Sequence, residues 1–565
     1  MRMKDLIAKR KRREAQHARA QRNAQEQKVQ TDTLTSEEYQ LPADFSEQVI
    51  REIKHLPTTI SNEEILRRRD MRDILTFTID PDDAKDFDDA LSFQVLETGN
   101  YQIGIHIADV THYVAEGSAV DEEAYQRGTS VYLVDRVIPM LPERLCNELC
   151  SLRPNEDKLC MSVIVEMNDQ AQVLRHKICR TVIHSDSRLT YQQAQAMLEE
   201  ARGERAPHDT SVVGDPAEAK GEELQEALLV LDKLAKELRR KRFEHGAINF
   251  ETPDVQFRLD EAGNPTEILF RTLTDANHLI EEFMLLANRI VAKEVGRKPT
   301  PDPSLKGREL NESSKSKGED IRGERPFVYR VHDMPDPDKM VKLGNFIRQF
   351  GFHLRTSAKR SVQNKHINAL LASCQGTNSQ TLIETLAIRS MAKAVYSTSN
   401  IGHYGLAFTH YTHFTSPIRR YPDMMVHRLV ARYLLQSKAT CRHDKEVLEE
   451  ACVHCSDTEQ MAQMAERNSI KEMQARWMSS RIGEEFDGVI SGVTEFGLFV
   501  QLSDTLTEGL VPIRTIEPHD YMQYDEENYC LIAARSGNTY TLSDSVRVRV
   551  ARVDVERKKI DFELV

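Results

Sequence analysis

The sequence lacks the marks of a membrane or secreted protein. It has no apolar run near the roughly 18 residues that would span a bilayer. Charged residues follow Met1 where a signal peptide would have an apolar core. The nine cysteines, an odd number in a chain of 565 residues, fit reduced thiols better than a disulfide framework. These absences favour a cytoplasmic protein that contacts no membrane.

Cysteines and histidines with the spacing of a metal site are also scarce. Cys452 and Cys455 form one CxxC, but neither a second pair nor a well-placed histidine follows. We interpret the two as packing residues on a helix, in preference to a zinc or redox site. His403, His410 and His413 have no cysteine or carboxylate partner at ligand spacing, so a zinc site there is the weaker interpretation.

An excess of positive charge is missing from the chain as a whole. The net charge of −13 argues at first sight against a nucleic-acid partner, but net charge governs solubility more than it locates a binding surface. The first thirty residues are strongly basic and have few large apolar side chains. This arm could bind phosphates, and a solvated basic tail with no specific partner is an equal alternative.

What the chain does contain is the pattern of a large mixed domain followed by a small barrel. Alternating residues in ALSFQVLE and YQIGIHIADV, joined by Thr98-Gly99-Asn100, predict a strand, a turn and a strand. Leucines at helical spacing predict a helix over 222–242, and further helices are expected over 283–293 and 423–436. Short strands broken by turns after residue 483 predict a small β-barrel.

The region before the main domain is predicted to form short helices. Ser46 can cap one helix, and Ser61 with Glu64 makes a capping box for another. Polar stretches near 202–220 and 300–324 are expected to be surface insertions. We therefore divide the chain into a basic arm (1–35), a helical linker (36–73), a main domain (74–435), a helical connection (436–482) and a barrel (483–565).

Six aspartates fall within ten positions of the segment TFTIDPDDAKDFDDALSF, residues 76–93. Four of them, Asp80, Asp86, Asp88 and Asp89, cannot all be ionised close together unless a cation offsets their repulsion or some take up protons. Carboxylate ligands suit a hard ion such as magnesium or manganese, and two such ions are a common device in phosphodiester cleavage. A solvated acidic loop is the alternative, but the apolar strands on both sides tie the segment to a core.

A calcium site of the EF-hand kind does not fit this segment. Counting from Asp80, the sixth position is Lys85 where glycine is needed, and the twelfth is Leu91 where glutamate is needed.

TIDPDDAKDFDDAL resembles the signature of the ribonuclease II / ribonuclease R family, the RNB exoribonucleases, in which aspartates in a D-x5-D-x-DD pattern hold magnesium. Other blocks resemble the family in the same order, among them HLIEEFMLLANR, RPFVYRVHDMPDPDKM and FTHYTHFTSPIRRYPDMMVHRLV. The likeness spans about residues 74–435 and is closer to ribonuclease R than to ribonuclease II. It implies an α+β fold, with helices packed on a sheet around an RNA channel and a C-terminal OB-fold barrel.

The resemblance also implies roles for individual residues. Asp80 and Asp89 match aspartates that contact magnesium with the scissile phosphate, Asp88 matches the one most closely tied to catalysis, and Asp86 completes the site. Asp82 and Asp83 fall outside the pattern, and we expect them to be solvated.

Beyond the aspartates, the resemblance implies four RNA contacts. Arg419, in TSPIRRYPD, matches an arginine that contacts the phosphate at the cleavage position, although the pattern alone would suggest a surface pair with Arg420. Tyr132 and Phe250 match aromatic residues that clamp the terminal bases, and a strand residue in a core is the alternative for Tyr132. Glu282 matches a glutamate near the RNA end.

The C-terminal barrel resembles the RNA-binding OB-fold repeated in the first protein of the small ribosomal subunit. Phe496 and Phe499 match its base-stacking aromatics, and Asp554 and Arg557 match its polar RNA-facing pair. Pro512 stands where relatives often have a histidine that contacts RNA, so we expect RNA affinity to remain, in weakened form.

The family usually carries two cold-shock barrels before the catalytic domain. The roughly seventy residues before the acidic motif have almost no strand pattern, and we expect these barrels to be absent. The resemblance implies a monomeric, magnesium-dependent enzyme that degrades single-stranded RNA and 3′ overhangs processively from the 3′ end to nucleoside 5′-monophosphates. A truncated or catalytically impaired RNA-binding relative with a regulatory role is the competing hypothesis, and a DNA-directed nuclease is a weaker one.

Overall fold

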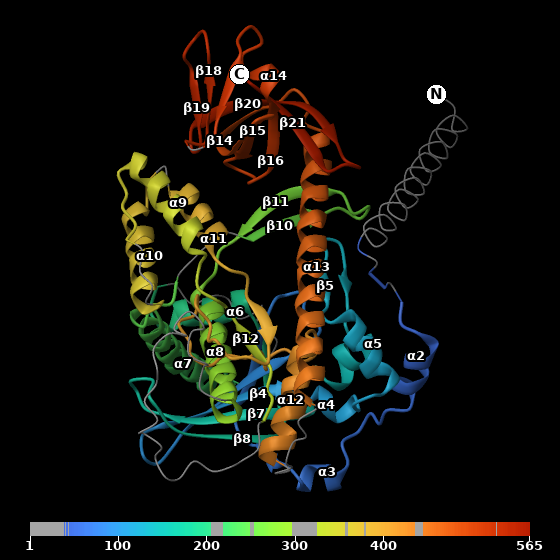
Figure 1. The fold of residues 1–565 in the computed structure, drawn as a ribbon. Helices are drawn as coiled ribbons and strands as arrows, with labels where there is room; N and C mark the ends of the chain where they lie inside the picture. Colours follow the sequence, from blue (N-terminus) through green and yellow to red (C-terminus); the bar gives the residue numbers. More distant parts are fainter. Residues whose placement is uncertain are drawn as a thin grey trace, which may run out of the picture.

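The computed structural model describes residues 39, 41–42, 44–204, 218–248, 254–296, 325–355, 360–377, 380–435, 444–526 and 528–565. The basic arm, Phe250 and most of the two expected insertions lie outside these residues. Among the described helices, none is both long and apolar enough to cross a membrane. The chain forms a large part of mixed helices and strands with a smaller barrel above it, as the sequence predicted (Figure 1).

A seven-stranded sheet forms the centre of the large part. Its order is β1-β8-β7-β4-β3-β2-β9, antiparallel except that β1 pairs with β8 and β9 with β2 in parallel. The strands are β1 (Arg69–Asp70), β2 (Thr76–Asp80), β3 (Asp89–Val95), β4 (Tyr101–Ala108), β7 (Asp157–Met167), β8 (Val173–His184) and β9 (Ser187–Thr190).

The middle strands form because their apolar residues are buried against helices. Phe77, Leu91 and Ile105 are fully buried in one core cluster. The predicted strand–turn–strand unit is confirmed as β3 and β4, joined by a turn in which the Leu96 amide donates to the Asn100 carbonyl at 2.8 Å. Gly99 has a φ of +78° there, a conformation that favours glycine.

Short helices precede the sheet, as expected. Ser46 caps α2 (Glu47–Lys54), and the Ser61 side chain accepts from the Glu64 amide at the start of α3 (Asn62–Leu66). The prediction of a helical linker over 36–73 is wrong near its C-terminal end, because Arg69–Asp70 form β1 and pair with Thr181 and Val182. Two residues are too few to show the alternation of apolar and polar side chains that predicts a strand, so β1 is recognised only from its pairing with β8.

Helices α6 (Tyr191–Ala201), α7 (Glu218–Glu244), α8 (Asp275–Val295) and α12 (Tyr421–Val430) share the sheet's core cluster. The leucine stripe predicted over 222–242 is confirmed on α7, where the residues buried on one face are Leu224, Leu228, Leu231 and Leu234. Two short helices, α4 (Val110–Tyr113) and α5 (Ala119–Arg127), follow β4, and the pair β5 (Val131–Tyr132) and β6 (Val137–Ile138) comes next.

A second group of helices lies between the sheet and the barrel. It consists of α9 (Pro337–Ile347), α10 (Arg360–Cys374) and α11 (Gln380–Ser390), which we call the helical bundle. Figure 1 shows this bundle beside the hairpin of β10 (Asp254–Leu259) and β11 (Pro265–Arg271). The bundle shares a core cluster with the barrel, and the rings of Phe346 on α9 and Tyr529 lie 4.8 Å apart.

The closed barrel has the strand order β14-β15-β16-β21-β20. Its strands are β14 (Glu485–Thr494), β15 (Gly497–Leu502), β16 (Glu508–Pro512), β20 (Ser545–Asp554) and β21 (Lys559–Leu564). A three-stranded sheet of β17 (Met522–Asp525), β18 (Cys530–Ala533) and β19 (Thr539–Thr541) lies beside it. The OB-fold prediction is confirmed.

One long helix, α13 (Asp444–Ser479), joins the two parts (Figure 1). Its 36 residues extend over about 54 Å. Cys452 and Cys455 are buried on this helix, and burial raises the pKa of the Cys455 thiol to about 12. The interpretation of the CxxC as packing residues therefore fits, because neither thiol is poised to ionise.

The barrel core can be tested with the chain's single tryptophan. Phe562 is fully buried, and its ring lies so close to Gly509 that a Cβ there would meet it at 2.4 Å. We expect Phe562→Ala to destabilise the barrel by about 3–5 kcal/mol, because the ring leaves a cavity. Trp477 lies beside Phe486 of the barrel, at 6.4 Å between ring centroids, so its fluorescence reports unfolding at this junction.

The matched control is Val565→Ala, which truncates an apolar side chain that is 60% exposed on the same barrel. It should leave the denaturant midpoint of the Trp477 transition unchanged. Equal midpoints for the two variants would contradict a barrel core centred on Phe562.

Candidate active site

The acidic segment forms the loop between two adjacent strands of the sheet. β2 ends at Asp80 and β3 begins at Asp89, so the loop places both carboxylates at the same end of these two neighbouring strands. Ser151 fixes the loop from below: its hydroxyl donates to the Lys85 carbonyl at 2.8 Å and accepts from the Phe87 amide at 3.0 Å. The four patterned aspartates are thus held, while Asp82 and Asp83 are exposed as expected.

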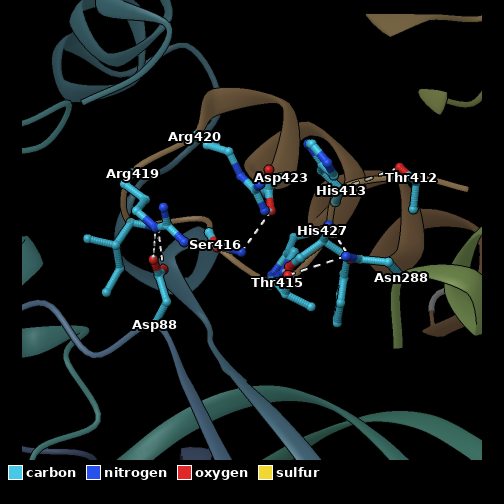
Figure 2. A network of polar contacts seen from close by, with 12 residues as sticks. Asp88, Asn288, Thr412, His413, Thr415, Ser416, Arg419, Arg420, Asp423 and His427 are labelled. Carbon is cyan, nitrogen blue, oxygen red and sulfur yellow. Dashed lines mark hydrogen bonds and ion pairs between the residues drawn. The ribbon is translucent and has the colours of Figure 1, made fainter. Parts of the chain in front are cut away.

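Asp88 and Arg419 meet although 331 positions separate them in the chain. Asp88 is only 4% exposed, and its Oδ1 accepts from the Ile418 amide at 2.9 Å. Its Oδ2 lies 3.2 Å from Arg419 Nε (Figure 2). Arg419 is therefore a residue of the acidic site, and the interpretation of Arg419 and Arg420 as a surface pair is wrong.

The turn that carries Arg419 is braced by a second carboxylate. Asp423, fully buried at the start of α12, accepts from the Ser416 amide at 2.7 Å and from Arg420 Nη2 at 2.8 Å. Arg419 Nη2 in turn donates to Ser416 Oγ at 3.0 Å (Figure 2). Because these bonds fix the turn while 43% of the Arg419 side chain stays exposed, the guanidinium can still contact a ligand.

Burial and mutual repulsion disfavour ionisation of all four aspartates. Burial raises the pKa of Asp80 and of Asp88 to about 7. Burial also raises the pKa of Asp86. The pKa of Asp89 lies well above its usual range, through burial and through the charges of Asp80 and Asp88. A site of this kind gains stability from any added positive charge.

The four carboxylates suit a hard divalent ion that takes its remaining ligands from water and substrate. Asp80 Oδ2 is buried and has no hydrogen-bond partner, so one oxygen is left for a cation. Across the described ranges, no three His, Cys, Asp or Glu side chains are arranged so that they could hold a metal ion by themselves. Magnesium commonly uses one or two carboxylates and completes its shell with waters and substrate phosphates. The aspartates of this site can therefore suit magnesium without forming a complete set of ligands.

Tyr132 lies at the same site. It is on β5, its side chain is 41% exposed, and its amide donates to Glu466 of α13 at 3.0 Å. Burial raises the pKa of its hydroxyl, which is near enough to Arg419 and Asp86 to respond to both charges. The alternative of a strand residue in a core is therefore wrong, and the ring is free to contact a ligand.

Glu282 lies apart from these residues in a different environment. It is 3% exposed on α8, and its Oε1 accepts from Arg242 Nε of α7 at 3.0 Å. Both side chains line a cavity of about 300 Å³. The structure thus shows Glu282 as a partner of Arg242, and its predicted contact with RNA stays a prediction.

The aromatic and polar residues predicted on the barrel are accessible. Phe496 is 52% exposed, and its ring meets the Phe499 ring edge-on, with 6.0 Å between centroids. Asp554 and Arg557 belong to the β20–β21 turn, where Asp554 Oδ1 accepts from the Arg557 amide at 3.1 Å. Pro512 ends β16 and precedes the short helix α14 (Ile513–Ile516).

Sequence reasoning missed Tyr191 and the brace made by Ser416 and Asp423. Tyr191 follows β9, whose Thr190 pairs with Asp80, so its ring comes beside the acidic edge. Burial raises the pKa of Tyr191, as do the charges of Asp89 and Asp80. The signal for Asp423 was present, since a serine and an aspartate flank the two arginines in TSPIRRYPD.

The raised pKa values predict how stability depends on pH when divalent ions are removed by a chelator. In the folded state Asp80 keeps its proton up to about pH 7, whereas in the unfolded state it loses the proton near pH 3.8. Its stabilising contribution is therefore complete below about pH 4 and is lost as the pH rises through about 7. We expect Asp80→Asn to stabilise the chelated protein at about pH 8, by on the order of 1–3 kcal/mol.

Thermal unfolding of the variant and the parent over this pH range measures the effect. Asp82→Asn is the matched control, because Asp82 is exposed on the same loop, and it should leave the profile unchanged. A profile for Asp80→Asn that coincides with the parent would contradict the electrostatic account of the loop.

The domains match two known families. Residues 68–436 match the RNB domain, and residues 479–564 match the S1 RNA binding domain. Ribonuclease R of Aquifex aeolicus (strain VF5) is 40% identical over 528 residues, which cover 93% of this chain and 69% of that protein. Ribonuclease R of Thermotoga maritima is 39% identical over 530 residues, which cover 93% of this chain and 68% of that protein.

A solved structure agrees with these matches. Mycoplasma genitalium RNase R in complex with ribose methylated single-stranded RNA superposes with a TM-score of 0.81 at 26% identity, covering 94% of this chain and 77% of that one. The order of the RNB and S1 domains agrees with the resemblance drawn from the sequence. The chain therefore belongs to the RNB family and is ribonuclease R-like in its sequence and fold.

Proposed function

We propose that this protein is a 3′-to-5′ exoribonuclease that acts as a monomer on single-stranded RNA and 3′ overhangs, hydrolysing them processively to nucleoside 5′-monophosphates. The observation that supports it most directly is the contact between Asp88 and Arg419 at the buried acidic edge. A guanidinium beside clustered carboxylates offers a phosphate both a positive contact and a place for divalent ions. Relatives that are 39% and 40% identical over 93% of this chain are named ribonuclease R.

Magnesium, or manganese in its place, is part of this proposal. Asp80, Asp86, Asp88 and Asp89 would supply its carboxylate ligands, one or two to each ion, with water and phosphate oxygens completing the shell. Asp80 Oδ2 is a buried oxygen without a hydrogen-bond partner and is available for this. When bound, the ion would supply positive charge for the attacking and leaving oxygens of the phosphodiester. Manganese shares the preference of magnesium for oxygen ligands and could replace magnesium.

The chain's own residues orient the substrate. Arg419, whose side chain is 43% exposed, can bind the non-bridging oxygens of the scissile phosphate through its guanidinium, while Ser416 and Asp88 fix its plane. Asp88 is itself fixed at both oxygens, by the Ile418 amide and by Arg419 Nε. It is therefore the carboxylate best placed to keep a constant position relative to the phosphate during cleavage.

The aromatic residues account for weak sequence discrimination. Tyr132 is exposed and its hydroxyl is within electrostatic reach of Arg419, so we propose that a base whose phosphate is bound by Arg419 stacks on its ring. Stacking accepts any base, because every base has a π-face. The S1 barrel adds a second surface with exposed aromatics, Phe496 and Phe499. Phe250 would complete the clamp, but it lies outside the described residues.

The activity can be tested with the full chain and a 3′-overhanging RNA. We expect shortening from the 3′ end only when magnesium or manganese is present, with 5′-monophosphates as products. Asp88→Asn should lower the rate by at least about 10²-fold, because it removes a charge at the reacting phosphate, and it should leave RNA binding largely intact. Asp83→Asn, an exposed position on the same loop, is the control and should behave as the parent.

Three outcomes of this assay would contradict the proposal. Full activity of Asp88→Asn would remove the catalytic assignment. A parent protein that binds RNA without shortening it would indicate the impaired relative. Preferential digestion of a matched DNA oligonucleotide would indicate a DNA-directed enzyme, since the 2′-hydroxyl is what distinguishes the two substrates.

The role of Arg419 can be tested separately with Arg419→Lys. Lysine keeps the positive charge but cannot contact Asp88, Ser416 and a phosphate with one planar group. We expect kcat to fall by about 10²-fold with a smaller change in KM, since the loss concerns a transition-state contact. The control is Arg355→Lys, an exposed arginine that follows α9, and an equal effect of the two changes would contradict the assignment.

A further inference from the structure

The segment that leads into the Arg419 turn is anchored at Phe414. Phe414 is fully buried, and side chains from two other elements bind both polar groups of its backbone. Its amide donates to Asn288 Oδ1 of α8 at 2.8 Å. His427 Nε2 of α12 donates to its carbonyl at 2.7 Å, since a carbonyl can only accept. The His427 ring also stacks on the Phe414 ring, with 4.3 Å between centroids. The chain is therefore held here by α8 and by α12.

Asn288 binds this segment through both atoms of its side-chain amide. Because a backbone N–H can only donate, the Asn288 oxygen must face Phe414, and this leaves Nδ2 for other partners. Nδ2 donates to Tyr411 Oη and to Thr415 Oγ1, each at 3.4 Å. Asn288 is 3% exposed, and 126 positions separate it from Phe414 in the chain. A buried asparagine in the middle of a helix is thus spent on fixing residues 411–415.

A short and stiff piece of chain connects this anchor to Arg419. Ser416 Oγ accepts from Arg419 Nη2 at 3.0 Å, and the Ser416 amide donates to Asp423 at 2.7 Å. Pro417 follows, and its ring fixes the backbone angle φ. The turn is thus held by Asp423 of α12 and, just before Ser416, by Asn288 of α8 (Figure 2).

We propose that Asn288 is a positioning residue for Arg419. By fixing Phe414 it sets the place of the Ser416 hydroxyl, and that hydroxyl holds the guanidinium. A displacement of about 1 Å at a reacting group can cost about 10²-fold in rate. This inference rests on the proposed function, because the phosphate that Arg419 would contact belongs to that function.

A role in packing alone predicts a different result from a role in positioning. If Asn288 only satisfied buried polar groups, its loss would lower the fraction of folded protein, and the molecules that stayed folded would be fully active. If Asn288 positions Arg419, the folded molecules still bind RNA but cleave it more slowly. The two roles therefore differ in kcat per folded molecule.

Asn288→Ala measures this difference in the full chain with magnesium and single-stranded RNA. The change removes the acceptor of the Phe414 amide and the donor to Thr415. We expect kcat to fall by at least about 10-fold, while KM changes by less than about 2-fold, because the other contacts with RNA remain. The affinity for RNA in a chelator should likewise stay within about 2-fold of that of the parent.

Ser162→Ala is the matched control. Ser162 is fully buried in the same core, and its Oγ lies 2.8 Å from His106 Nδ1 and 2.6 Å from Thr181 Oγ1. Its loss also breaks a buried polar network, but one that involves no residue of the Arg419 turn. This control should keep the kcat of the parent per folded molecule. Equal losses of kcat in the two variants would show a general effect of destabilisation and overturn the inference.

A double variant shows whether Asn288 acts through Arg419. Lysine at position 419 cannot bind Ser416, Asp88 and a phosphate with one planar group, so little positioning is left to lose. Asn288→Ala combined with Arg419→Lys should therefore have the kcat of Arg419→Lys alone, within about 2-fold. If the two losses multiply, Asn288 acts independently of Arg419, and the inference is overturned.

Chemical labelling of Arg419 tests its position without any reaction on RNA. A dicarbonyl reagent that modifies arginines is applied in a chelator, and the labelled sites are quantified by mass spectrometry. We expect Arg419 of Asn288→Ala to react several-fold faster than in the parent, because its contact with Ser416 loosens. Arg355, which is exposed, is the internal reference and should react equally in both proteins. An unchanged rate at Arg419 would overturn the inference.

Thr415→Val keeps the test decisive if Asn288→Ala does not fold. Valine is nearly isosteric with threonine and removes the hydroxyl that accepts from Asn288 Nδ2. We expect a change of about 2-fold in the same directions, slower cleavage and faster labelling of Arg419. No change in either measurement would overturn the inference. A parent protein that degrades no RNA refutes the proposed function, while the labelling rates still decide whether Asn288 positions Arg419.

Discussion

The burial of four carboxylates at one edge of the sheet is the constraint on which this molecule depends. Each of Asp80, Asp86, Asp88 and Asp89 has a raised pKa, first through burial. Such a cluster is costly in a protein without a compensating charge. Arg419 supplies part of that charge, and the polypeptide positions it with a turn that Asp423 and Ser416 brace. Folding therefore assembles a site that remains short of positive charge, and binding of cations and phosphate partners can correct the deficit.

How far the sequence predicts this site depends on how local each feature is. The aspartates could be identified because all four lie within ten consecutive positions, and the flanking apolar strands showed that the segment belongs to a core. The contact of Arg419 with Asp88 could not be read from spacing, since 331 positions separate them. A family resemblance identified Arg419 where the residue pattern alone favoured a surface pair. Tyr191 went unnoticed, because only the parallel pairing of β9 with β2 brings it to Asp80.

In the fold, too, local features could be predicted from the sequence and features that depend on distant partners could not. Long periodic elements, such as the leucine face of α7 and the β3–β4 hairpin, were predicted from hydrophobic spacing. Strand β1 was assigned to the helical linker, because two residues have no period and pair with a strand more than a hundred positions away. The surroundings of Glu282 could not be read from the sequence for a related reason: its carboxylate is bound to Arg242, a partner that only the packing of α7 on α8 supplies.

Helix α13 has a consequence for the smallest fragment that the protein can process. The same rigid element holds the loop of Tyr132, through Glu466, and supports the barrel near Trp477, about 16 Å further along its axis. An RNA engaged at both places must extend across that span. Under the proposed function, an RNA shortened below that span would no longer reach the barrel and would keep only the contacts near Arg419. Under this function, the length of the helix sets the shortest RNA that can reach both places at once.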